Sequence, residues 1–255
     1  MYPDFNLGPL TVHTFGLMMA LGFVAAGTVA YFEFKRKGMN PEHVYWLTIA
    51  SAVGGIAGAK IHYLLLHLDE LKSDPFASAF SGAGLVWYGG AIGGALAAIG
   101  VILLYKLPLG KVLDAGAPAI AIGYAFGRMG CFLNGDDYGR PSTLPWSMQF
   151  PKGSPPTTLQ FGPGVTVQPT QLYEAFSSLV IFGILMYLRP KLKRDWSMIC
   201  LYLALAGTER FLVEFVRMQR EGQLQQQLLA LGTAIVAGVA FIWIQTRPAP
   251  KPKTR

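Results

Sequence analysis

Seven apolar segments, separated by short polar stretches, are the dominant pattern along the chain. Each is close to the roughly 20 residues that an α-helix needs to cross the hydrocarbon core of a membrane. The pattern therefore predicts an all-α fold, a polytopic membrane bundle of seven transmembrane helices. The segments cover approximately residues 14–34, 44–66, 84–105, 112–135, 171–188, 197–216 and 224–245.

Composition favours a membrane protein over a soluble one. Of the 255 residues, 52% are hydrophobic and 14% are charged, whereas soluble domains carry roughly 25% charged residues. The net charge of +7 does not indicate nucleic-acid binding, because the basic residues lie between apolar segments. Cys131 and Cys200 both fall in apolar runs and imply no disulfide framework. The sequence has no metal-spaced cluster of His and Cys and no phosphate-cradling loop, so no cofactor is predicted.

The distribution of lysine and arginine predicts how the bundle is oriented, because basic residues concentrate in cytoplasmic loops. Thirteen of the 21 fall in one set of loops and the C-terminal tail, five fall in the other set, and three lie within spans. This predicts an N-terminus outside, a C-terminus in the cytoplasm, and an outer, periplasmic loop region at 136–170. Residues 1–255 are then a single integral membrane domain, with 246–255 as a basic cytoplasmic tail.

Small residues in the second and third segments predict a close contact between two helices. The run GGIAGA covers residues 54–59, and GGAIGGALAAIG covers 89–100. A glycine-lined ligand cleft is the alternative interpretation, in which Gly89 and Gly90 contact a substrate.

Charged residues inside apolar segments point to a functional site. A charge at the centre of a membrane helix costs roughly 2.5–3.5 kcal/mol on insertion scales, yet Arg128 and Arg210 lie within the fourth and sixth segments. At a rise of about 1.5 Å per residue, each lies roughly 10 Å from the outer end of its helix. Glu214 and Arg217 follow Arg210 at i+4 and i+7, so the three share one helix face.

The polar residues within the spans mostly occupy the outer-leaflet half. The inner half has little beyond Asp114 and Thr48, which argues against a transporter or flippase, because a transport path needs polar groups throughout. Two arginines with one nearby carboxylate leave a net positive charge, and arginine suits bidentate phosphate binding. The residues alone therefore predict an outer-leaflet cleft that binds an anionic lipid, with a self-satisfied ion pair as the alternative. The polar residues of the outer half include Lys60, His62, Tyr88, Gln171, Tyr173 and Glu174.

Four separated motifs add a family resemblance. They are VWYGGAIGG at 86–94, GRMGCFLNGDDYGR at 127–140, QPTQLYEA at 168–175 and ERFLVEFVR at 209–217. In order, spacing and position these motifs resemble those of bacterial prolipoprotein diacylglyceryl transferases. The resemblance covers nearly the whole chain, from HTFGLMMALGF to the seventh segment.

The resemblance implies an activity. Such a protein transfers the sn-1,2-diacylglyceryl group of phosphatidylglycerol to the lipobox cysteine thiol of a prelipoprotein, forming a thioether and releasing glycerol 1-phosphate. It implies a multi-pass protein of the bacterial cytoplasmic (inner) membrane, with its active site on the periplasmic side. Its partners are phosphatidylglycerol and prelipoprotein signal peptides, and no cofactor is implied.

The resemblance also assigns roles to residues. Arg128 and Arg210 would hold the phosphate, and Asn134 and Tyr88 would complete the catalytic set. Together with the polar residues of the outer half, the predicted substrate-binding set is Gly89, Gly90, Asp136, Gly139, Arg140, Gln171, Tyr173, Glu174, Glu214, Arg217, Lys60 and His62.

The chain departs from the family pattern at some positions. Tyr88 stands where the best-studied members have histidine, and Cys131 stands where they have asparagine. A tyrosine is a poor base at neutral pH, so Tyr88 is predicted to hydrogen-bond substrate, and His62 is one candidate for the base. Cys131 is either a packing residue or a reactive thiol. The departures keep a second hypothesis open, a divergent paralogue that binds anionic phospholipid or modifies an unusual substrate.

Overall fold

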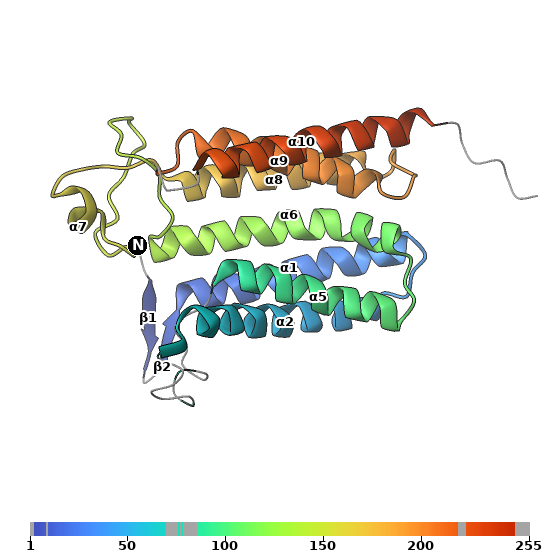
Figure 1. The fold of residues 1–255 in the computed structure, drawn as a ribbon, viewed down its shortest axis with the longest axis horizontal. Helices are drawn as coiled ribbons and strands as arrows, with labels where there is room; N and C mark the ends of the chain where they lie inside the picture. Colours follow the sequence, from blue (N-terminus) through green and yellow to red (C-terminus); the bar gives the residue numbers. More distant parts are fainter. Residues whose placement is uncertain are drawn as a thin grey trace, which may run out of the picture. The chain divides into compact units, whose positions relative to one another are not determined.

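Seven long helices dominate the computed structural model, which describes residues 3–8, 10–69, 76, 78, 86–218 and 223–247 (Figure 1). They agree with the seven apolar segments to within three residues at every end. Lys72, Arg220 and the basic tail from residue 248 onward lie outside the described residues. The long helices are α1 (Thr14–Arg36), α2 (His43–Leu66), α5 (Trp87–Leu104), α6 (Leu109–Asn134), α8 (Thr170–Leu188), α9 (Ser197–Glu214) and α10 (Gln223–Thr246).

The predicted all-α class is confirmed, and a small β-hairpin that was not predicted precedes α1. Strand β1 (Asp4–Leu7) pairs antiparallel with β2 (Leu10–His13). Apolar and polar residues alternate through DFNL and LTVH, which is the period of a strand. The alternation covers only four residues in each strand, which is too short to stand out beside a 20-residue apolar run.

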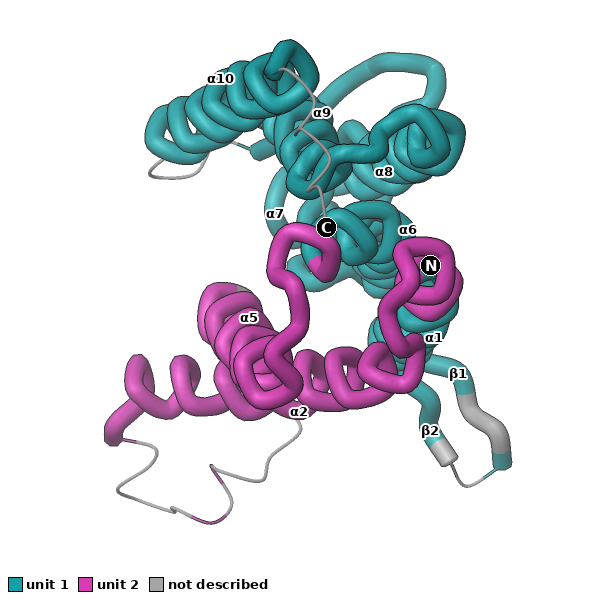
Figure 2. The backbone as a smooth tube through the Cα atoms, turned by 90° about the vertical axis from the view of Figure 1, so that its right-hand side faces the viewer, with its two compact units in different colours: residues 1–29, 113–255 teal, residues 30–112 magenta. Residues whose placement is uncertain are grey.

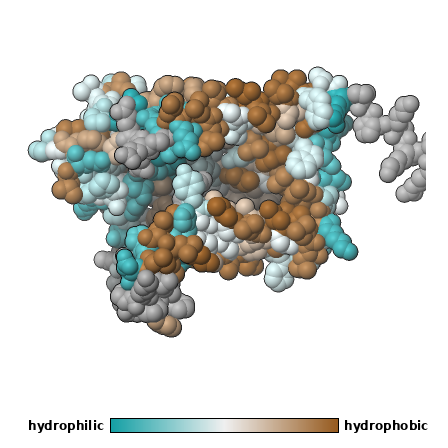
Figure 3. Space-filling view, viewed as in Figure 1, coloured by the Kyte–Doolittle hydropathy of each residue, from teal (hydrophilic) through white to brown (hydrophobic). Residues whose placement is uncertain are grey.

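Four helices in the described part of the chain are long and apolar enough to span a membrane, namely α1, α2, α8 and α10. The apolar stretch Tyr88–Leu104 of α5 is shorter, and α9 carries three charged residues within its 18. Apolar side chains cover much of the helical surface, including α10, on the face shown in Figure 3. These helices indicate an integral membrane protein, while seven spans and the orientation of the termini stay predictions.

The chain divides into two compact units, residues 1–29 with 113–255 and residues 30–112 (Figure 2). The single domain predicted from sequence stays a prediction. In the second unit, α2 and α5 pack through their glycines. A Cβ added to Gly93 would lie 2.9 Å from Gly58 Cα, and one added to Gly54 would lie 2.5 Å from Ala97 Cβ. The predicted contact between the small-residue runs is therefore confirmed.

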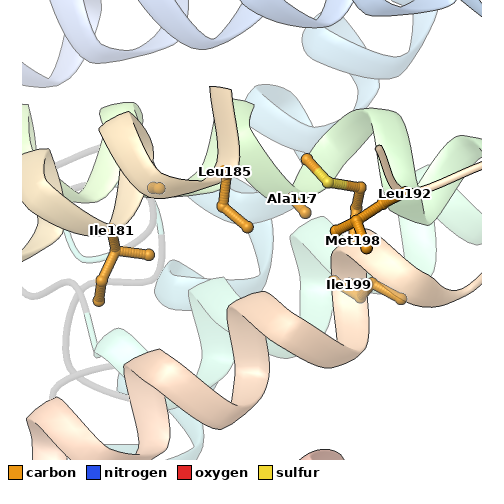
Figure 4. Packing of buried hydrophobic residues seen from close by; sticks show 7 residues of the cluster. Ala117, Ile181, Leu185, Leu192, Met198 and Ile199 are labelled. Carbon is orange, nitrogen blue, oxygen red and sulfur yellow. The ribbon is translucent and has the colours of Figure 1, made fainter. Parts of the chain in front are cut away.

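The core of the first unit joins α6, α8 and α9 (Figure 4). Asp114, one of the few polar residues of the inner half, is buried at one end of this core, and its Oδ1 accepts a hydrogen bond from the Ile199 backbone N–H at 3.0 Å. Asp114 thus satisfies an unpaired donor in the first turn of α9, which is a structural role. The buried residues of the core are Ala117, Ala121, Ile181, Leu185, Leu192, Met198 and Ile199.

The loop region 136–170 is folded and contains the short helix α7 (Thr157–Phe161). Its own core is formed by Tyr138, Phe150 and Val167, and the Tyr138 and Phe150 rings stack with centroids 5.3 Å apart. This small core fixes the path of the chain where it leaves α6 and returns to α8.

Candidate functional site

Three arginines converge on one buried carboxylate in the first unit. Arg128 projects from α6, Arg210 projects from α9, and Arg217 follows the end of α9. Glu174 of α8, with a side chain only 1% exposed, pairs with Arg128 Nε, with Arg210 Nη1 at 3.1 Å and with Arg217 Nη1 at 3.2 Å. One carboxylate thus brings together Arg128 and Arg210, the two charges within apolar segments, and their equal depth in the membrane stays a prediction.

Two further carboxylates join these groups. Asp137 Oδ2 lies 2.9 Å from Arg128 Nη1, and Asp137 Oδ1 lies 3.1 Å from Arg217 Nη2. Glu214 Oε1 lies 2.5 Å from Arg210 Nη2 and 3.7 Å from Arg217 Nε, so Glu214 pairs with the arginines of its own helix face as predicted. We call these six residues the arginine cluster: Arg128, Arg210, Arg217, Asp137, Glu174 and Glu214.

The charge of the arginine cluster differs from the sequence prediction. Three guanidinium groups meet three carboxylates, so the expected net positive charge was wrong. Only Glu214, which shares a helix with Arg210, is visible from sequence spacing as a nearby carboxylate. Glu174 and Asp137 come from other elements, and their approach depends on how those elements are rotated. Matched charges are what allow arginines to be buried, because a buried unpaired charge costs several kcal/mol.

Neutral groups hold two of the guanidinium groups in place. Arg128 Nε donates a hydrogen bond to Tyr124 Oη at 2.9 Å, and the guanidinium lies 5.1 Å from the centroid of the Tyr124 ring. Arg210 Nη2 donates to Gln226 Oε1 of α10 at 3.3 Å. Tyr124 lies one helix turn before Arg128, and Gln226 lies on the neighbouring helix α10. The two contacts fix the direction in which the guanidinium N–H groups of Arg128 and Arg210 point.

The turn after α6 is tied to the start of α8. Gln171, fully buried, donates through Nε2 to the Asp136 carbonyl at 2.5 Å, and Thr170 Oγ1 donates to the Asp137 carbonyl at 2.8 Å. Asn134 Nδ2 donates to Asp136 Oδ2 at 2.9 Å. The predicted residues Asn134, Asp136 and Gln171 thus lie together and hold the segment that carries Asp137.

Burial changes the ionisation of two groups at the ends of these helices. Burial raises the pKa of the Asp136 carboxyl, and hydrogen bonds from Asn134 and Cys131 offset part of this. Burial acts to lower the pKa of Arg217, but the carboxylates of Asp137 and Glu174 outweigh it and raise that pKa above its ordinary value. Arg217 therefore remains a cation in its buried position.

Gly139 and Arg140 connect the loop region to the end of α9. Gly139 forms an antiparallel bridge with Arg217, and the Arg140 backbone N–H donates to the Val216 carbonyl at 3.0 Å. A Cβ on Gly139 would lie 2.5 Å from the Val216 carbonyl oxygen and 2.7 Å from Thr170 Cγ2. Arg140 Nε donates to the Arg217 carbonyl at 3.0 Å, so both predicted residues position the backbone of Arg217.

The remaining predicted residue of the first unit, Tyr173, lies on α8, and its hydroxyl accepts a hydrogen bond from Trp146 Nε1 at 2.6 Å. Trp146 belongs to the loop region, so this contact adds a further link between the loop and α8. Tyr173 directly precedes Glu174 on α8.

Five predicted residues belong to the second unit, which is described by itself. Lys60 Nζ lies 5.3 Å from the centroid of the Tyr63 ring on α2. A Cβ added to Gly90 would lie 3.3 Å from the Gly55 carbonyl oxygen, and one added to Gly89 would overlap Gly58 and His62. The Tyr88 side chain is exposed. Helix packing explains why residues 89 and 90 are glycines, and their contact with a substrate stays a prediction, as do the roles of the other three.

Sequence reasoning missed one member of the arginine cluster, Asp137, and two residues that border it, Tyr124 and Glu209. Glu209 Oε1 accepts a hydrogen bond from Ser177 Oγ at 3.1 Å and interacts electrostatically with Glu174, Arg128 and Arg210. Two signals were available. Tyr124 lies four residues before Arg128, a spacing that brings side chains together on a helix, and Asp137 lies inside the GRMGCFLNGDDYGR motif.

Comparison with known proteins identifies relatives over nearly the entire chain. A family model described as prolipoprotein diacylglyceryl transferase matches residues 4–244. Similar proteins from several bacteria are named phosphatidylglycerol–prolipoprotein diacylglyceryl transferase. The one from Clostridium tetani is 32% identical over 93% of this chain and 95% of its own length. The one from a Nostoc species is 30% identical over 96% and 90%, and the one from Vibrio vulnificus is 36% identical over 84% and 77%.

Proposed function

The chain belongs to the prolipoprotein diacylglyceryl transferase family, and from this premise we propose that it transfers the sn-1,2-diacylglyceryl group of phosphatidylglycerol to the lipobox cysteine thiol of prelipoproteins. The product carries a thioether, and glycerol 1-phosphate is released. The relatives that are named as this transferase align with the chain over nearly their whole length. This does not favour the alternative of a non-catalytic paralogue.

The observation that carries the proposal is the arginine cluster. In the reaction, the thiol gives up its proton to solvent, sulfur forms a bond to the glyceryl carbon, and the bond from that carbon to the phosphate oxygen breaks. The electron pair and the negative charge go to the departing phosphate. Guanidinium groups stabilise charge that develops there, and one such donor is typically worth about a hundredfold or more in rate. In this proposal Arg128 and Arg210 hold the phosphate, and Arg217, one of the predicted substrate-binding residues, contacts it as well.

The other predicted residues take supporting roles. Asn134, Asp136 and Gly139 shape the site through the turn after α6, and Glu214 and Glu174 keep the arginines in place. Tyr88 hydrogen-bonds substrate. The remaining substrate contacts that we propose are with Gly89, Gly90, Lys60, His62, Arg140, Gln171, Tyr173 and Arg217.

The proposed setting is the bacterial cytoplasmic membrane. Seven spans, an outer N-terminus and a cytoplasmic C-terminus follow from the apolar segments and the distribution of basic residues. With that topology, the outer ends of α6 and α9 bring the arginine cluster to the periplasmic leaflet. Phosphatidylglycerol enters from that leaflet, and the prelipoprotein signal peptide presents its cysteine from the same side.

A reconstituted reaction tests the proposal. Purified protein, phosphatidylglycerol and a lipobox peptide with one cysteine are combined, and the peptide mass is measured. We expect a gain of one diacylglyceryl group that resists thioester cleavage. Arg128→Ala and Arg210→Ala should each lower the rate at least about a hundredfold. Lys193→Ala, which removes an exposed side chain from the loop between α8 and α9, should leave the rate unchanged. Full activity in both arginine variants, with folding verified by circular dichroism, would refute the proposed role of the cluster.

A further inference from the structure

The matched charges of the arginine cluster raise a question about phosphate binding. Three carboxylates already pair with the three guanidinium groups. A phosphate that binds there adds at least one negative charge to a balanced, mostly buried cluster, which is unfavourable at low local dielectric. A phosphate ligand is accommodated most easily if one carboxylate moves away from the arginines and the phosphate binds them instead. This inference rests on the proposed function, because it concerns the same site.

Exposure distinguishes the three carboxylates. The side chains of Glu174 and Glu214 are 1% and 3% exposed, whereas the side chain of Asp137 is 29% exposed. Moving Glu174 would break its pairs with three arginines in the interior, and a buried charge without a partner is strongly destabilising. Asp137 can turn toward water, where its charge is solvated. It is therefore the carboxylate that a ligand can replace.

The geometry of Asp137 resembles that of a bound phosphate. Its two carboxylate oxygens contact two different guanidinium groups, Arg128 Nη1 at 2.9 Å and Arg217 Nη2 at 3.1 Å. Two phosphate oxygens bridge a pair of arginines in the same way, because carboxylate and phosphate offer guanidinium groups similar charge-assisted hydrogen bonds. A phosphate in this place keeps both arginine contacts that Asp137 makes.

The backbone around Asp137 can stay fixed while its side chain moves. The carbonyl of Asp137 accepts from Thr170 Oγ1 at 2.8 Å, and the carbonyl of Asp136 accepts from Gln171 Nε2 at 2.5 Å. Asp137 also has a φ of 59°, a left-handed conformation that Asp and Asn tolerate better than most residues. Rotation about two side-chain bonds is then enough to release both arginines.

We propose that Asp137 is a displaceable counter-ion of the arginine cluster, and that it competes with the phosphate group of the substrate for Arg128 and Arg217. Asp137 keeps the arginines paired and correctly aimed, and the phosphate takes its place between them. The competition lowers the affinity for phosphate ligands, so it also eases release of the phosphate product.

Binding measurements on Asp137 variants test this competition. Asp137→Asn removes the charge and Asp137→Gly removes the side chain, and both residues are compatible with a positive φ. Asp137→Glu keeps the charge, and Asp195→Asn removes an exposed carboxylate from the α8–α9 loop as the matched control. For each detergent-purified protein, the Kd is measured for phosphatidylglycerol and for glycerol 1-phosphate, together with the KM and kcat of transfer.

We expect Asp137→Asn and Asp137→Gly to lower the Kd about tenfold, which corresponds to about 1.4 kcal/mol, and to lower KM more than they change kcat. Tighter binding of both ligands, or of phosphatidylglycerol alone, supports the competition, and the two results distinguish a general phosphate subsite from one that needs the lipid. An unchanged or higher Kd in both variants overturns it, because Asp137 then only braces the arginines. Asp195→Asn should remain close to wild type, and Asp137→Glu, which keeps the competing charge, should bind neither ligand more tightly than wild type.

The outcomes separate this inference from the proposed function. If the wild-type protein neither binds phosphatidylglycerol nor modifies the lipobox peptide, the proposed function fails before any variant is compared. If the wild type is active and neither neutral variant binds more tightly, only the competition fails. Unfolding temperatures of the two neutral variants are measured alongside, so that a folding defect in one leaves the other as the test.

Discussion

Replacing Glu174 by glutamine should destabilise the protein more than any other single change in the arginine cluster. The substitution keeps the shape of the side chain and removes one negative charge that contacts Arg128, Arg210 and Arg217. The side chains of these arginines are 12%, 29% and 11% exposed, so water compensates little of the lost attraction. Removing one partner of a buried ion pair typically costs about 3–5 kcal/mol, and we expect the free energy of unfolding to fall by that amount.

Unfolding by sodium dodecyl sulfate in mixed micelles, followed by tryptophan fluorescence, measures this loss. Asp195→Asn, which removes an exposed carboxylate, should change the free energy of unfolding by no more than about 0.5 kcal/mol. A double-mutant cycle with Arg217→Gln should give a coupling free energy of about 0.5–3 kcal/mol. A loss below about 1 kcal/mol for Glu174→Gln, with no coupling to Arg217, would show that water screens these contacts and would refute the reasoning.

Two further predictions concern the turn after α6. Gly139→Ala should lower the free energy of unfolding by about 1–3 kcal/mol, because its Cβ would overlap the Val216 carbonyl and Thr170 Cγ2; Gly183→Ala, whose Cβ meets nothing within 4 Å, is the matched control and should not destabilise. Burial raises the pKa of the Asp136 carboxyl above its ordinary value of 3.8. The folded protein therefore holds the carboxyl proton more tightly than the unfolded chain does. The free energy of unfolding that Asp136 contributes is lost as the pH rises from 3.8 through the raised pKa. Asp136→Asn should therefore gain stability relative to wild type across this window in denaturation series at several pH values, and a pH-independent difference would contradict the expectation.

Local patterns predicted much of what the structure contains. The seven helices agree with the apolar segments because a membrane helix must be apolar over a length set by the bilayer, and this requirement is written residue by residue in the chain. The i, i+4 spacing placed Glu214 beside Arg210, and Arg128 and Arg210, both visible as charges within apolar segments, contact the same carboxylate of Glu174. The hairpin at residues 4–13 was missed because its alternation is only four residues long in each strand.

The charge of the arginine cluster depends on the tertiary structure. Glu174 and Asp137 approach the arginines from α8 and from the turn after α6, and no spacing in the sequence shows which way those elements are rotated. The folded loop region is a similar case, because the bridge between Gly139 and Arg217 joins residues far apart in the chain.

The sequence by itself thus determined the seven long helices, the small-residue contact between two of them and the residue types of the site, since each is a property of one helix or one local motif. Only the tertiary structure decided which carboxylate each arginine meets, that the charges balance, and that Asp137 is the accessible one. Those properties arise between elements, where the rotation of each helix about its own axis and the path of the connecting loop select the partners.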